Sequence, residues 1–200
     1  MSQKVSTFAR VSAHGYDYVF ILVVCNDYYW PVRDALARQA DAFGQDLGLR
    51  GLFVEAFQRR QFDAAHEVLA KPWPTDIKSK MEADPEPILL IIQHDFATFD
   101  PNQHSWAVIW LSDFENQPYD ITPVLAKLAS ITRSGEDLLA YLQGIAAKSA
   151  RATAASQFTK YIALKPGIFG CAIDVGAILT HLAGTAQGTH RAEVRRTRGR

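Results

Sequence analysis

The segment that most constrains the fold is the aliphatic run 88–92, which ends abruptly in His94 and Asp95 after a single glutamine. Its apolar residues are consecutive and do not alternate with polar ones, so the run predicts a strand that is covered on both faces. Open α/β sheets, in which helices cover both faces, usually bind ligands at the carboxyl ends of their strands. The sequence therefore indicates a candidate site beside His94 and Asp95.

The rest of the chain predicts a sheet of this kind. Further apolar strands are expected at residues 18–25, 52–57, 105–111, 161–164 and 168–175. Helical spacing and stop signals predict helices at residues 31–43, 62–70, 75–82, from 122 onward and from 134 past 150, and residues 178–182 are expected to end the fold. The link between strands 87–93 and 105–111 is too short for a helical crossover, so that pair is expected to be antiparallel.

This order of elements predicts a single three-layer α/β domain over residues 1–183, with a mixed, mostly buried sheet and C-terminal helices. An α+β arrangement is the alternative. Residues 1–15 are polar, and we expect them to be loosely held. Residues 184–200 carry five arginines and one glutamate, which predicts a basic, disordered tail on a mildly acidic body.

Composition narrows the classes of protein that remain. The two cysteines, Cys25 and Cys171, have no CxxC spacing, which argues against a disulfide scaffold and a zinc ribbon. The N-terminal region has no signal-peptide pattern, and no apolar run approaches the roughly 20 residues that a membrane helix needs. Neither GxxxxGK[ST] nor GxGxxG occurs, so no cofactor is predicted. We expect a soluble, cytoplasmic protein that does not contact membranes.

Two enzymatic hypotheses follow if strands 18–25 and 87–93 are parallel neighbours, because their carboxyl ends then meet. In the first, Cys25 is a nucleophile, His94 is its base and a carboxylate orients the imidazole. In the second, Asp27, His94, Asp95 and His104 hold a metal that activates water, with the hairpin bringing His104 back towards His94. Glu55 can join either group. The simpler alternative is a buried cysteine and a turn capped by His94 and Asp95.

Aromatic residues near the same strand ends suggest a different role. An exposed aromatic rim is typical of protein-binding surfaces, and the candidate partner-binding residues are Tyr28, Tyr29, Trp30, Phe96 and Phe99. The alternative is a hydrophobic lid that packs over the edge of the sheet.

The sequence therefore favours a protein–protein interaction or regulatory module, which binds another protein or associates with itself. The alternative is a small hydrolase-like or metal-dependent enzyme that uses Cys25, Asp27, His94 and Asp95. Nucleic-acid binding is expected only through the arginine-rich tail, since the body is acidic.

Overall fold

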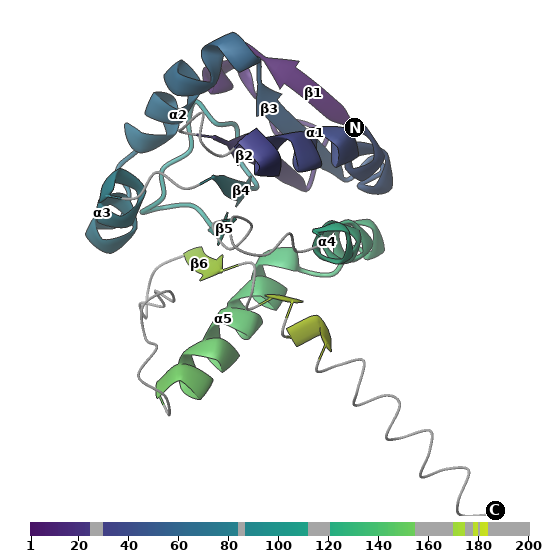
Figure 1. Cartoon of the computed structure of the whole chain (residues 1–200), viewed down its shortest axis with the longest axis vertical. Coiled ribbons are helices and arrows are strands. Elements are labelled where there is room, and N and C mark those ends of the chain that lie inside the picture. Colours follow the sequence, from purple (N-terminus) through teal and green to yellow (C-terminus); the bar gives the residue numbers. More distant parts are fainter. Residues whose placement is uncertain are drawn as a thin grey trace, which may run out of the picture.

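A mixed sheet of six strands lies at the centre of the protein (Figure 1). The computed structural model describes residues 1–24, 30–83, 87–111, 121–154, 170–174, 178–179 and 181–183. Within these residues the strands are β1 (Ser2–Val5), β2 (Tyr18–Val23), β3 (Gly51–Ala56), β4 (Ile88–Ile92), β5 (Trp106–Trp110) and β6 (Gly170–Asp174). Their order in the sheet is β1-β3-β2-β4-β5-β6.

Five of the described strands run in one direction, and β4 alone runs in the opposite direction. β1, β3 and β2 are parallel to one another, whereas β4 is antiparallel to both β2 and β5, and β6 is parallel to β5. The expected antiparallel pairing of β4 with β5 is confirmed. The parallel arrangement of β2 and β4 on which both enzymatic hypotheses depend does not occur: the two strands are neighbours but antiparallel, with Val19 paired to Ile92 and Val23 to Ile88.

Helices cover both faces of this sheet, as predicted for an α/β domain (Figure 1). One face carries α1 (Trp30–Asp46), α4 (Thr122–Ser134) and α5 (Leu138–Ala154). The other carries the short 3-10 helix η1 (Phe8–Arg10), α2 (Gln61–Leu69) and α3 (Thr75–Ala83), and a second 3-10 helix, η3 (Gln58–Arg60), joins β3 to α2. Residues 178–179 and 181–183 are also helical. None of the described helices is both long and apolar enough to cross a membrane.

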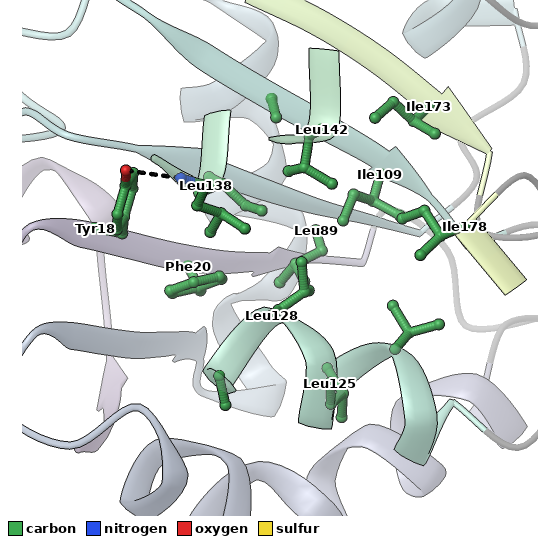
Figure 2. Packing of buried hydrophobic residues seen from close by; sticks show 14 of the residues in the cluster. Tyr18, Phe20, Leu89, Ile109, Leu125, Leu128, Leu138, Leu142, Ile173 and Ile178 are labelled. Atoms are coloured by element: carbon green, nitrogen blue, oxygen red, sulfur yellow. Dashed lines mark hydrogen bonds between the residues drawn. The ribbon is translucent and has the colours of Figure 1, made fainter. Parts of the chain in front are cut away.

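Two hydrophobic cores result, one on each face, because successive residues of a strand point to opposite sides. In β2, Tyr18, Phe20 and Leu22 enter the core beneath α1, α4 and α5, whereas the intervening valine and isoleucine residues enter the core beneath α2 and α3. Figure 2 shows the first core, where residues of β2, β4, β5 and β6 pack against α4 and α5. Every residue of β2, β3, β4 and β5 is buried, which confirms the prediction of strands covered on both faces.

The first residues of the chain form an edge strand, so the expectation that they are loosely held is wrong. Phe53 donates its backbone N–H to the Met1 carbonyl, and Phe57 donates to the Val5 carbonyl, both at 2.9 Å. These bonds join main-chain atoms, and the polar side chains of β1 therefore gave no sign of them. An ideal Cβ at Gly44 of α1 would lie 2.6 Å from the Ser2 nitrogen, so α1 approaches β1 closely because residue 44 has no side chain.

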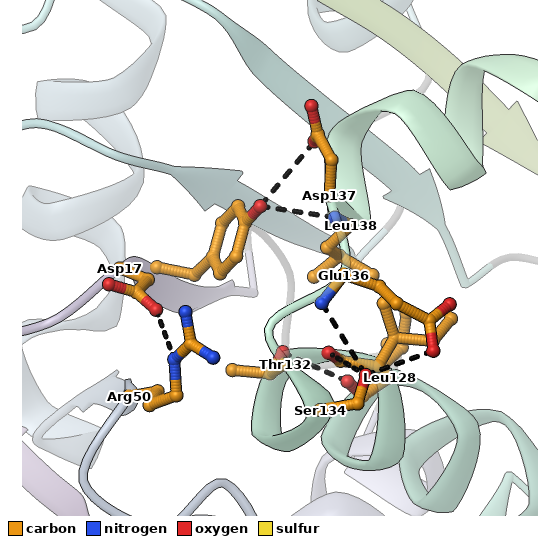
Figure 3. A network of polar contacts seen from close by, with 10 residues as sticks. Asp17, Arg50, Leu128, Thr132, Ser134, Glu136, Asp137 and Leu138 are labelled. Atoms are coloured by element: carbon orange, nitrogen blue, oxygen red, sulfur yellow. Dashed lines mark hydrogen bonds and ion pairs between the residues drawn. The ribbon is translucent and has the colours of Figure 1, made fainter.

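The turn between α4 and α5 is fixed to the start of β2 by a polar network (Figure 3). Gly135, with a φ of 81°, ends α4 in the left-handed conformation that glycine adopts readily. The buried Tyr18 hydroxyl then accepts a hydrogen bond from the Leu138 N–H at 3.0 Å and donates to Asp137 at 3.4 Å. Asp137 in turn accepts from the Ala140 N–H at 3.0 Å, which caps α5. This network positions α5 on the sheet.

Candidate functional site

The two strand ends that the enzymatic hypotheses require lie at opposite ends of the sheet. His94 follows the end of β4, which pairs with the start of β2, whereas Val24 follows the end of β2. The paired segment from Val19 to Val23 alone spans about 13 Å. Cys25 and Asp27 lie outside the described residues, but Cys25 follows Val24 directly in the chain. The antiparallel pairing therefore removes the geometric basis for a site that joins Cys25 and Asp27 to His94 and Asp95.

At the carboxyl end of β4, two histidine rings stack. The ring centroids of His94 and His104 are 3.9 Å apart, at an interplanar angle of 29°. The predicted return of His104 towards His94 is confirmed, because the β4–β5 pairing places Ile92 opposite Trp106 and so brings the two ends of the connection together. Burial, followed by the nearby His104, lowers the pKa of His94, and the carboxylate of Asp95 acts in the opposite direction.

The hydrogen bonds of His104 and Asp95 favour a structural role over a metal site. Asp100 donates its backbone N–H to His104 Nδ1 at 3.0 Å, so Nδ1 is the acceptor and the ring proton of neutral His104 lies on Nε2. Asp95 accepts from the Ser12 hydroxyl at 2.8 Å and from the Ala13 N–H at 2.5 Å, and these bonds lower its pKa. In the part of the chain that the structure describes, no three histidine, cysteine or acidic side chains are placed to hold a metal ion.

The two phenylalanines of the β4–β5 connection are core residues and do not form an exposed rim. Phe96 and Phe99 are each 2% exposed. Phe96 packs edge-on against Phe8, with centroids 5.7 Å apart, and Phe99 packs edge-on against Trp73 at 5.8 Å. Lys71 donates to the Phe96 carbonyl at 2.7 Å and lies over the Phe96 ring. These side chains attach the connection to the helical layer, which corresponds to the alternative of a packed lid.

Several other predicted site residues lie outside the described part of the chain. Tyr28 and Tyr29 are among them, and Trp30 begins α1. Residues 184–200 are also outside the described residues, so binding of nucleic acid through them stays a prediction. Glu55 is buried in β3 and pairs with Lys4 of β1 at 3.1 Å, which joins two neighbouring strands.

Neither Cys171 nor the groove between α1 and α4 carries a catalytic signature. Cys171 is buried in β6, and burial raises the pKa of its thiol to about 12, which keeps it protonated and unreactive at neutral pH. A groove of about 160 Å³ lies between α1 and α4, next to Phe43 and Leu125. It is smaller than the roughly 300–1,000 Å³ typical of small-molecule sites.

A different set of residues is exposed at the carboxyl ends of the parallel strands. Phe57, directly after β3, is 49% exposed, and Phe62, in the first turn of α2, is 54% exposed. Each of the other phenylalanines in the described residues is at most 3% exposed. Between the two rings, Arg59 and Arg60 are also exposed. We call these four residues the Phe57–Phe62 turn.

The local sequence explains why this turn has a fixed shape. Phe57 is anchored by its backbone hydrogen bond to Val5, and Arg60 donates its N–H to the Phe57 carbonyl at 2.7 Å, which closes η3. The residues of α2 that face the core are Ala64, Ala65 and Val68, so Phe62 is left at the surface. The backbone of the turn is therefore set by β3 and α2, and about half of the surface of each aromatic side chain stays exposed.

The side chains of the two arginines have different surroundings. Arg60 pairs with Asp63 at 3.0 Å, where both side chains are more than half exposed. Arg59 has no ion pair with any residue within the described ranges. Sequence reasoning missed this site because it assigned Phe57 to a strand and Phe62 to a helix. The available signal was two phenylalanines flanking an arginine pair, FQRRQF.

Comparison with known proteins gives no relative: no family model matches the chain, and neither a curated protein nor a solved structure matches it significantly.

Proposed function

We propose that this protein is a protein-binding module and that its partner binds at the Phe57–Phe62 turn. The observation that carries the proposal is the contrast between two half-exposed phenylalanines and all the other described ones, which are buried. Full burial of a phenylalanine side chain is worth about 1.5–3 kcal/mol, and the two rings in this turn keep much of that free energy unused. A partner that covers them gains it.

The chemistry of the turn indicates what the partner segment contains. Aromatic residues and arginine are enriched at protein interfaces and among the residues that contribute most to binding. Arg59 carries a charge without an ion pair among the described residues, and the exposed Arg60–Asp63 pair is worth only about 0–1 kcal/mol, so either arginine can bind another carboxylate. We therefore expect a segment of another protein with an apolar side chain beside one or more acidic residues.

A peptide-display selection tests this proposal. A library of random peptides is selected on the full chain, and the affinities of the enriched peptides are measured for wild type and variants. The expected peptides combine acidic with aromatic or aliphatic residues. The double variant Phe57→Ala, Phe62→Ala and the single variant Arg59→Glu are each expected to weaken their binding by about tenfold or more.

Leu49→Ala supplies the matched control, because Leu49 is 89% exposed and lies just before the other end of β3. This variant is expected to bind the peptides like wild type. Circular dichroism establishes that each variant is folded. Failure to enrich peptides, or peptides that bind the double variant as well as wild type, would overturn the proposal. A wild-type dimer that the double variant converts to a monomer would instead identify a second copy as the occupant.

A further inference from the structure

The β4–β5 connection is held against the connection between α2 and α3 by contacts at several points. Lys71 donates to the carbonyls of Phe96 and Ala97 at 2.7 and 3.2 Å. Asn102 donates its side-chain amide to the Pro72 carbonyl, and the Phe99 ring packs against Trp73. The stacked pair of His94 and His104 lies at the two ends of this connection, and the His104 ring stacks on the Phe99 ring with centroids 6.2 Å apart, which links the pair to these contacts.

One hydrogen bond within the connection requires a neutral histidine. His104 Nδ1 accepts the Asp100 N–H at 3.0 Å, and it can do so only while Nδ1 carries no proton. A proton on Nδ1 places two N–H donors against each other and breaks the bond. The His94 ring at 3.9 Å adds a second constraint, because a positive charge on one ring opposes a positive charge on the other.

The charged groups around the pair act in both directions. The carboxylates of Asp95, beside His94, and Asp100, beside His104, favour protonation. Both carboxylates already accept hydrogen bonds, Asp95 from Ser12 and Ala13, and Asp100 from Asn102 and Gln103. The Lys71 ammonium, which lies near Asp100, and His14, which lies near Asp95, partly offset these negative charges.

We propose that the His94–His104 pair is a pH-sensitive latch. In its neutral form the pair holds the turn at residues 99–105 against the α2–α3 connection, and protonation of His104 releases that turn. Imidazole is the side chain that ordinarily changes its charge between about pH 5 and 8, so release is expected on acidification below neutral pH. This device is independent of the proposed partner surface, because it lies at the opposite end of the sheet.

Amide hydrogen exchange, followed by NMR, tests the latch. The Asp100 amide and the indole N–H of Trp106, which donates to the Pro101 carbonyl at 2.9 Å, report on the turn. Between about pH 7.5 and about pH 5, after correction for intrinsic exchange, the protection of the Asp100 amide is expected to fall by about tenfold or more. The fall is expected to follow the titration of the His104 ring protons.

Three variants distinguish the latch from a general effect of acid. His104→Asn keeps an acceptor at the δ position that cannot gain a proton, so the protection of the Asp100 amide is expected to be independent of pH. His94→Phe keeps a stacked ring without a charge, so release is expected at a higher pH than in wild type. His66→Asn removes an exposed histidine of α2 and is expected to behave like wild type.

Two results would overturn the proposal. One is protection of the Asp100 amide in wild type that does not change as His104 titrates, or no titration of His104 in this range. The other is the same loss of protection in His104→Asn as in wild type. If His104→Asn does not fold, the wild-type titration and the shift in His94→Phe decide the question.

Discussion

The two ends of the sheet contain similar types of residue but use them differently. At the carboxyl end of β4, His104 and Asp95 are engaged in hydrogen bonds within the protein, and Phe96 and Phe99 are buried. At the carboxyl end of β3, two phenylalanines are half exposed beside Arg59 and Arg60. Polar residues after a buried strand can therefore be taken up by contacts within the fold, whereas the exposed aromatic side chains after β3 remain accessible to a partner, and the proposed binding surface rests on this difference.

The direction of β4 accounts for much of this difference. Three parallel strands, β1, β3 and β2, end at the same edge of the sheet, where ligands of α/β proteins usually bind. β4 runs the other way, so the His-Asp pair that follows it lies at the edge where those parallel strands begin. The His-Asp pair, which is the most conspicuous motif of the sequence, therefore contacts other parts of the fold. The exposed Phe57–Phe62 turn lies at the other edge of the sheet.

The largest expected effect is a difference in the free energy of unfolding between alanine substitutions of a phenylalanine at each end of the sheet. Phe99→Ala is expected to lower the free energy of unfolding by about 3–5 kcal/mol, because it leaves a cavity beside Trp73. Phe62→Ala is the matched control and is expected to change that free energy by no more than about 0.5 kcal/mol, since its ring is 54% exposed. Urea denaturation measures both. Equal losses would mean that the two ends do not differ as described.

A smaller effect is expected where β6 meets β5, at the end of the sheet near His104. An ideal Cβ at Gly170 would lie 2.0 Å from the Trp106 ring, so Gly170→Ala forces that buried indole to move and is expected to cost about 1–3 kcal/mol. Gly144→Ala in α5 is the control: nothing lies within 4 Å of its ideal Cβ, and it is expected to stabilise by up to about 1 kcal/mol. Thermal unfolding of both variants checks this, and a neutral Gly170→Ala would contradict the close packing.

The smallest effect concerns the pH dependence contributed by Asp95. Hydrogen bonds from Ser12 and Ala13 hold its folded-state pKa below the ordinary value of 3.8. Its contribution to stability is therefore fully present above about pH 3.8 and is lost as the pH falls through the lower folded-state pKa. Because the carboxylate is exposed, we expect less than about 1 kcal/mol.

Thermal unfolding of wild type and Asp95→Asn as a function of pH measures this contribution. The difference in melting temperature between the two proteins is expected to be constant near neutral pH and to shrink below about pH 3.8. A difference in melting temperature that stays constant down to acidic pH would show that the hydrogen bonds from Ser12 and Ala13 do not depend on the negative charge of Asp95.

Local sequence patterns were sufficient for most of the secondary structure. The consecutive apolar residues of β2, β4 and β5 predicted strands buried on both faces, and each is buried at every position. The link between β4 and β5 is too short for a crossover, so it predicted their antiparallel pairing. The same hairpin predicted that His104 returns to His94, because it places the two ends of the link side by side. β1 was missed, since its pairing depends on main-chain atoms that its polar side chains do not reveal.

The sequence by itself determined the fold class and the identity of the central strands, because burial on two faces leaves a pattern in consecutive residues. Only the tertiary structure decided the direction of β4 relative to β2, since α1, β3, α2 and α3 lie between these strands in the chain and so long a connection permits either direction. It also decided which phenylalanines are exposed. Phe57 and Phe99 are the same residue type, and only the packing of α2 and of the β4–β5 connection leaves one at the surface and places the other in the core.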